Sequence, residues 1–163
     1  MEACHHHSCC NGNHKEENTC HGCCCQKNLI ELSSKEKSFL EVLAKTPFLP
    51  IVSFVAKSSK SNHLENIMLS PVYLENCEDT LEIVKERSSI LNNLETIGAI
   101  SIDYDIEIEN ADYSIYANSN IYNYFEKTIY ESKNNPNFIF DTPHMECGSI
   151  ALTGIGQSLI YED

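Results

Sequence analysis

The amino-acid sequence predicts an α+β fold over residues 32–163, preceded by a Cys/His-rich arm, residues 1–31, that is disordered without metal. Three observations predict this organisation. A long amphipathic helix is followed at once by a strictly alternating segment, and the chain closes with an apolar stretch typical of a strand that enters a helix. The segment 4–25 contains no Leu, Ile, Val or Phe, so it has no side chains with which to build a core.

The first part of the domain is predicted to be helical. A capping box beginning at Ser33 predicts a helix over 34–45, with Phe39, Leu40, Val42 and Leu43 on its apolar side. Pro50 suits the first position of a helix, which predicts a second, largely buried helix over Ile51–Lys57. The stretch 66–74 is interpreted as either a short strand or an irregular packed segment.

A longer helix is predicted over residues 79–97. Asp79 provides its N-cap and Gly98 its end. At about 100° per residue one face is apolar, formed by Ile83, Val84, Ile90, Leu91, Leu94 and Ile97. The opposite face is polar and carries Lys85, Ser89, Asn92 and Thr96.

The remaining elements alternate between strands and helices. Strict alternation of apolar and polar residues predicts a strand over Ile100–Glu109, and a second strand is expected around Tyr113–Tyr116. Ser119 or Asn120 is expected to cap a helix near 121–132. The final stretch, 148–160, is predicted to be a strand that leads into a short helix.

The N-terminal arm has the composition of a metal-binding segment. Thiolate and imidazole are the usual ligands of zinc and also suit Cu(I) or Cd(II), so the identity of the metal stays open. Gly22 eases the turn of the C-x-x-C pair formed by Cys20 and Cys23. The alternative is a solvated, thiol-rich tail without a specific metal. The candidate ligands are Cys4, His5, His6, His7, Cys9, Cys10, His14, Cys20, His21, Cys23, Cys24 and Cys25.

Three further thiol and imidazole side chains lie in the predicted domain. Cys77, His144 and Cys147 are candidate additional ligands for a metal held by the arm. The alternative for each is a small buried thiol or a surface imidazole.

Charge and composition limit the classes of function. The formal charge is −13 and the sequence pI is about 4.8, which opposes a general binder of nucleic acid or acidic membranes. No apolar leader and no membrane-spanning run is visible, so we expect a cytoplasmic protein. Thiols are kept reduced there, which favours metal binding over disulfides. No nucleophile–base pair or phosphate loop is recognisable, so we expect no enzyme activity.

Two stretches resemble winged helix-turn-helix domains of MarR-type and related bacterial regulators. Residues 90–101 carry the pattern L-x-x-L-x-x-x-G-x-I, which resembles a recognition helix passing into the first wing strand. Residues 150–157 carry L-T-x-x-G, which resembles the last wing strand and its turn. The resemblance covers about residues 32–160 and implies a winged helix with an enlarged wing.

The resemblance implies a dimer that binds DNA through helix 79–97. Lys85, Ser89, Asn92 and Thr96 would then face the major groove, and Lys57 and Lys60 would hold the DNA backbone. The predicted wing departs from the family because it is acidic, with Asp103, Asp105, Glu107, Glu109 and Asp112. Because the metal-binding arm and this domain lie on one short chain, we expect a metal-responsive transcription regulator. The alternative is a metal buffering or delivery protein whose acidic winged helix is a protein-interaction module.

Overall fold

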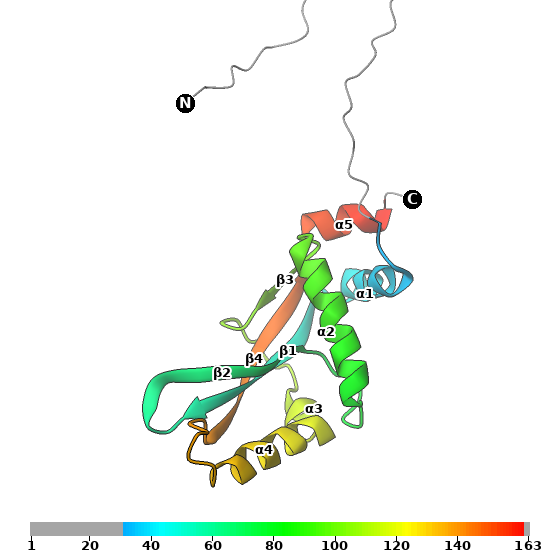
Figure 1. The fold of residues 1–163 in the computed structure, drawn as a ribbon. Coiled ribbons are helices and arrows are strands. Elements are labelled where there is room, and N and C mark those ends of the chain that lie inside the picture. The colour runs from blue at the N-terminus through cyan, green and yellow to red at the C-terminus, as the bar shows by residue number, and fades with distance from the viewer. Residues whose placement is uncertain (1–30, 162–163) are drawn as a thin grey trace, which may run out of the picture. The chain divides into compact units, whose positions relative to one another are not determined.

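A four-stranded antiparallel sheet forms the centre of the fold (Figure 1). The computed structural model describes residues 31–161. The strands are β1 (Phe48–Ser58), β2 (Ser61–Val72), β3 (Ile100–Asp103) and β4 (Thr142–Leu152). Their order across the sheet is β2-β1-β4-β3, so the first and last strands among residues 31–161 pair in the middle.

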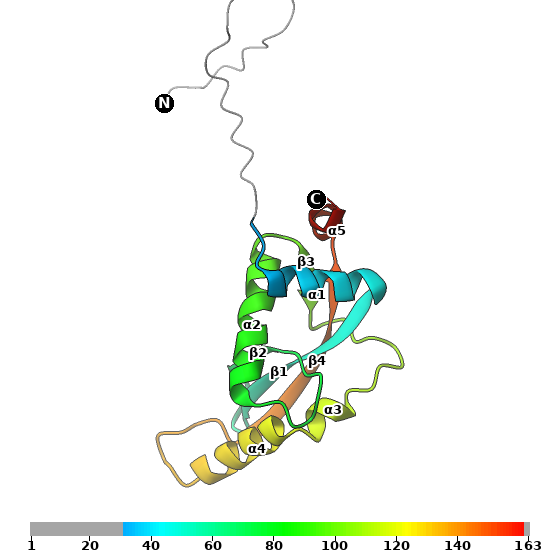
Figure 2. The ribbon, with the colours of Figure 1, turned by 90° about the vertical axis from the view of Figure 1, so that its right-hand side faces the viewer.

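Five helices in the described part of the chain accompany the sheet, which confirms the predicted α+β class (Figures 1 and 2). The two helices that border the site described below are α1 (Ser34–Lys45) and α2 (Leu81–Thr96). A short helix and a longer one follow β3, and a last helix follows β4. These are α3 (Ser114–Ala117), α4 (Asn120–Ser132) and α5 (Gly154–Tyr161).

The helix starts follow from local capping. The capping box of α1 is present: the Glu36 N–H donates to the Ser33 Oγ, and the Glu36 carboxylate accepts from the Ser33 N–H at 2.7 Å. The Ser119 Oγ accepts from the Tyr122 N–H at 3.1 Å and caps α4, as predicted. Gly98 ends α2 with a φ of 74°, a conformation that favours glycine.

One correction concerns the cap of α2. The Thr80 Oγ1, and not the Asp79 carboxylate, accepts the Ile83 N–H. Asp79 instead accepts from the backbone of the preceding loop. Two oxygen-bearing side chains in a row can both serve as caps, and the sequence alone does not decide between them.

The predicted helix over Ile51–Lys57 is wrong, because these residues form the centre of β1. The strand is buried on both sides, and short apolar runs of this kind do not distinguish a buried strand from a buried helix. Residues 66–74 contribute most of their length to β2, in agreement with one of the two interpretations. A hairpin, β1–β2, therefore connects α1 with α2.

Two further strand predictions need correction. The alternating segment 100–109 is a strand only over Ile100–Asp103, because β3 pairs with β4 at only four positions, Ile100 to Asp103. Tyr113–Tyr116 lies largely in the short helix α3 and not in a strand. The Asp112 carboxylate accepts the Ser114 N–H at 2.8 Å, which starts a turn at that point. The predicted strand and helix at the end of the chain are confirmed as β4 and α5.

The buried side chains form two groups, and α2 contributes to both, with Val84 in the first and Leu91 and Leu94 in the second. Val52, Phe54 and Ala56 of β1 belong to the α4 core, which also contains Ile121, Phe125 and Ile129 of α4. Ile51, on the other face of β1, belongs to the α1–α2 core. That core also contains Leu40, Leu43, Leu91, Leu94, Ala99, Ile100 and Ile150. Successive residues of a strand point to opposite faces, which explains how one strand serves both cores.

Candidate functional site between helices α1 and α2

An open groove lies between α1 and α2 and has a volume of about 370 Å³. This is at the lower end of the roughly 300–1,000 Å³ that ligand sites occupy. Helical periodicity builds its walls, because residues three and four apart share one side of a helix. Ser34, Ser38 and Val42 line it from α1, and Ile83, Arg87 and Ile90 line it from α2.

The floor of the groove is apolar. Phe39 and Ile90 are half-buried there, whereas Val42 and Ile83 are 43% and 39% exposed. The Phe39 ring meets the Tyr73 ring edge-on, with centroids 5.5 Å apart. This aromatic contact holds the Phe39 ring in place, and the exposed aliphatic side chains leave the groove open to a ligand.

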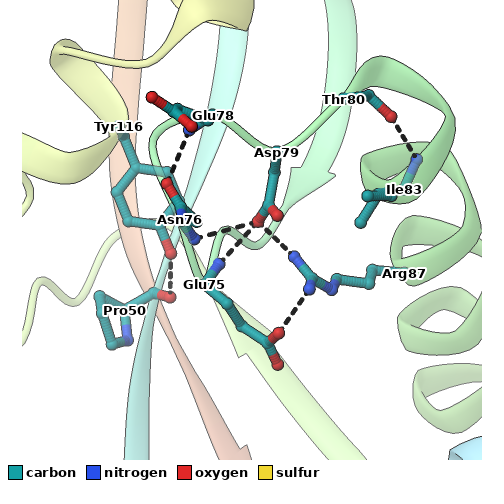
Figure 3. Close-up of polar contacts among 9 residues, drawn as sticks. All are labelled: Pro50, Glu75, Asn76, Glu78, Asp79, Thr80, Ile83, Arg87 and Tyr116. Carbon is teal, nitrogen blue, oxygen red and sulfur yellow. Dashed lines mark hydrogen bonds and ion pairs between the residues drawn. The ribbon is translucent and has the colours of Figure 1, made fainter.

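Charged side chains form the rim. Lys35 of α1 and Glu86 of α2 form an ion pair across the groove. Arg87 forms ion pairs with Glu75 and Asp79, each at 2.5 Å (Figure 3). Both cations of the rim are therefore already paired with carboxylates of the chain itself.

Asp79 organises the loop that leads into α2. Its carboxylate accepts the N–H groups of Glu75 and Asn76 at 2.9 and 3.1 Å, in addition to the Arg87 guanidinium (Figure 3). Partial burial raises the pKa of the Asp79 carboxyl, but these hydrogen bonds together outweigh burial and leave the pKa below its usual value. The loop thus holds Glu75 in a defined place at the edge of the groove.

Arg87 is fixed by more than its two carboxylate partners. Its guanidinium lies 5.9 Å from the centroid of the Tyr73 ring, a distance suited to a cation–π contact. Its side chain is only 19% exposed. Arg87 therefore supports the wall of the groove, and its guanidinium group is ion-paired with carboxylates of the same chain.

The predicted DNA-contacting residues share one exposed face of α2. Lys85, Ser89, Asn92 and Thr96 are all exposed, and the Thr96 Oγ1 donates to the Asn92 carbonyl at 2.7 Å. Three exposed glutamates of the same helix flank this face, namely Glu82, Glu86 and Glu95.

The two lysines predicted to hold a DNA backbone are in different environments. Lys57, on β1, forms ion pairs with Glu65 at 3.7 Å and with Glu146 at 3.4 Å. Lys60 is exposed at the tip of the β1–β2 hairpin. The carboxylates beside Lys57 reduce the positive potential that phosphate binding requires.

The predicted metal ligands of segment 4–25 lie outside the described residues. Of the three other candidates, Cys77 is exposed before α2, His144 is exposed on β4, and Cys147 is half-buried on β4. Burial raises the pKa of the Cys147 thiol, with a further contribution from the Glu107 charge. Within residues 31–161, no three His, Cys, Asp or Glu side chains come close enough together to hold a metal ion.

The groove was not anticipated from the sequence. Phe39, Val42, Ile83 and Ile90 were recognised only as apolar positions of amphipathic helices. Their periodicity identifies a face that contacts something, but it does not say how much of that face the rest of the chain covers. The ion pairs of the rim were indicated in the sequence only by the closeness of Glu75 and Asp79 to Arg87 along the chain.

The fold and the groove together define a small α+β protein with an exposed, apolar junction between two helices. Comparison with known families matches residues 27–161 to the family described as abortive infection alpha. The chain belongs to the abortive infection alpha family. No curated protein and no solved structure gives a significant match. None of the helices in the described part of the chain is long and apolar enough to cross a membrane.

Proposed function

We propose that this chain acts in abortive infection as an adaptor that binds a partner protein in the groove between α1 and α2. The observation that carries the proposal is the exposed apolar floor formed by Val42 and Ile83 beside the half-buried Phe39 and Ile90. Exposed apolar side chains that are adjacent and bordered by charges mark interaction sites in soluble proteins. The name of the family supplies the biological process.

The Cys/His-rich segment 4–25 is proposed to bind zinc or another thiophilic metal, as its composition predicts. A metal-binding segment joined to a protein-interaction module is also what the alternative expected from the sequence would contain, namely a metal buffering or delivery protein with an acidic winged helix. We also retain the proposed relationship to winged-helix domains. The strand β3 follows α2 directly and pairs antiparallel with β4, which supports this relationship. The β1–β2 hairpin, however, occupies the place of the predicted second helix.

DNA binding through α2 is the second candidate function. The exposed row of Lys85, Ser89, Asn92 and Thr96 favours it. The flanking glutamates and the total charge of −13 weaken it, because carboxylates repel phosphate. Mobility-shift assays at low salt with Lys85→Ala, with and without zinc, test this candidate. Loss of a shift in the variant supports it, and no shift by the wild-type chain refutes it.

The adaptor function is tested by the yield of progeny virus from infected bacterial cells that express the chain. Val42→Arg places a long charged side chain in the groove. Ile139→Arg is the matched control, since Ile139 is 49% exposed, lies in the loop after α4 and makes the same change in charge. We expect wild type and Ile139→Arg to lower the yield, and Val42→Arg to restore it.

Two further measurements make this result interpretable. Equal melting temperatures and equal cellular levels of the two variants exclude a folding defect as the cause of restoration. If wild type lowers the yield and Val42→Arg lowers it equally, the groove does not perform the function and the proposal is wrong.

A further inference from the structure

The shape of the groove indicates the kind of segment that fits it. The lining residues run from Ser34 to Val42 on α1 and from Ile83 to Ile90 on α2. At a rise of about 1.5 Å per residue, each wall extends for roughly 10–12 Å, which is about two helical turns. A wall of this length can contact about two or three apolar side chains that lie one turn apart on an amphipathic helix.

The charge of the rim indicates the charge of that segment. The side chains of Glu75 and Glu86 are 64% and 54% exposed. Glu82 is exposed one turn before Glu86 on the same side of α2. The cations Lys35 and Arg87 are paired with Glu86, Glu75 and Asp79, so that with Glu82 the rim and its border carry four carboxylates against two cations. The groove therefore presents an excess of negative charge to an approaching partner.

Charge complementarity selects between the candidate occupants. A second copy of this chain carries the same formal charge of −13 and would be repelled on approach. An acidic peptide would be repelled for the same reason. A segment with Lys or Arg beside its apolar anchors would gain favourable contacts with Glu75, Glu82 and Glu86.

We propose that the groove between α1 and α2 binds a basic amphipathic helix of a partner protein, whose apolar side chains contact Phe39, Val42, Ile83 and Ile90 and whose Lys or Arg side chains contact the rim carboxylates. This inference rests on the proposed adaptor function and specifies its ligand. The Lys35–Glu86 ion pair is exposed on both sides, so a cation of the partner can share Glu86 at little cost.

The test uses the full-length chain and two helical peptides with identical Leu spacing, one flanked by Lys and the other by Glu. Fluorescence anisotropy at physiological salt gives the dissociation constants. We expect the Lys peptide to bind at least about tenfold more tightly than the Glu peptide, with the difference shrinking as salt is raised. Val42→Arg should weaken binding of the Lys peptide by at least about tenfold, and Ile139→Arg by less than about twofold.

A charge-matched pair of variants tests the rim separately. Glu82→Gln should weaken the Lys peptide by about two- to threefold, whereas Glu109→Gln, an exposed carboxylate in the loop after β3, should leave it unchanged. Equal affinities of the two peptides, or equal effects of these two substitutions, would overturn the inference and leave the adaptor function standing. If neither peptide binds and Val42→Arg also lowers the virus yield as wild type does, the adaptor function itself is wrong.

Discussion

The two faces of the sheet differ in how completely helices cover their apolar side chains. On one face α4 contributes Phe125, which stacks on Phe54 of β1 with ring centroids 5.5 Å apart. On the other face α1 and α2 bury leucines against the sheet but leave Val42 and Ile83 exposed where the two helices meet. Both faces use amphipathic helices, so the open groove arises from the junction of two helices and not from a lack of apolar residues.

The largest difference is expected between truncating a side chain of the α4 core and truncating one that lines the groove. Phe54→Ala removes a buried ring of the α4 core, and we expect a loss of about 3–5 kcal/mol in the free energy of unfolding. Val42→Ala removes exposed methyl groups, and we expect a change within about 0.5 kcal/mol. Urea denaturation of both variants measures the difference. Similar losses would mean that Val42 is part of the core and that the groove is closed.

A second prediction concerns the close approach of Gly148 on β4 to the end of β3 and the residue that follows it. A Cβ at Gly148 would lie 2.4 Å from the Asp103 carbonyl oxygen and 2.9 Å from the Tyr104 Cα. Gly148→Ala should therefore lower the free energy of unfolding by about 1–3 kcal/mol, because the backbone must move. Gly154→Ala is the control, since its Cβ meets nothing within 4 Å. Equal thermal stability of the two variants contradicts the observed packing.

A third prediction uses the pH dependence of the rim network. The pKa of the Asp79 carboxyl is lower in the folded chain than in the unfolded chain, so its stabilising contribution is present above the unfolded value and is lost as pH falls through the folded value. Asp79→Asn should cost about 1–2 kcal/mol near neutral pH and progressively less below about pH 4. Denaturation at several pH values gives the difference. A difference that is independent of pH would show that the Asp79 charge is not what stabilises the loop.

The smallest effect is expected at the ion pair across the groove. Lys35 and Glu86 are both well exposed, and exposed pairs contribute about 0–1 kcal/mol. Lys35→Gln should thus lower the free energy of unfolding by less than about 1 kcal/mol, and added salt should remove the difference. A larger loss in thermal denaturation would indicate that the pair holds the two helices together.

Local signals in the sequence identified α1, α2, α4 and α5, whereas α3 was predicted as a strand and a helix was predicted within β1. The capping box at Ser33, the cap at Ser119 and the stop at Gly98 each depend on a few neighbouring residues, and all three are present. The segment 51–57 was misassigned because it is a buried central strand, paired with β2 on one side and, about ninety residues later in the sequence, with β4 on the other. Non-local pairing of this kind leaves no trace in a short window of sequence.

The candidate site was predictable only in its parts. The sequence identified the apolar positions of α1 and α2, but their exposure depends on how the two helices meet. The capping role given to Asp79 was wrong because its carboxylate accepts from Arg87 and from the loop N–H groups, while Thr80 caps the helix. The exposed polar row from Lys85 to Thr96 was placed correctly on α2, because helical periodicity alone determines which residues share a face.

The most direct test of the groove is a titration of the full-length chain with the Lys-flanked peptide, followed by methyl resonances in NMR spectra. We expect the largest shifts at Val42, Ile83 and Ile90, which line the groove, and small shifts at Ile106 and Ile139, which are exposed elsewhere. Shifts at Ile106 and Ile139 that equal or exceed those of the groove residues would contradict a binding site between α1 and α2.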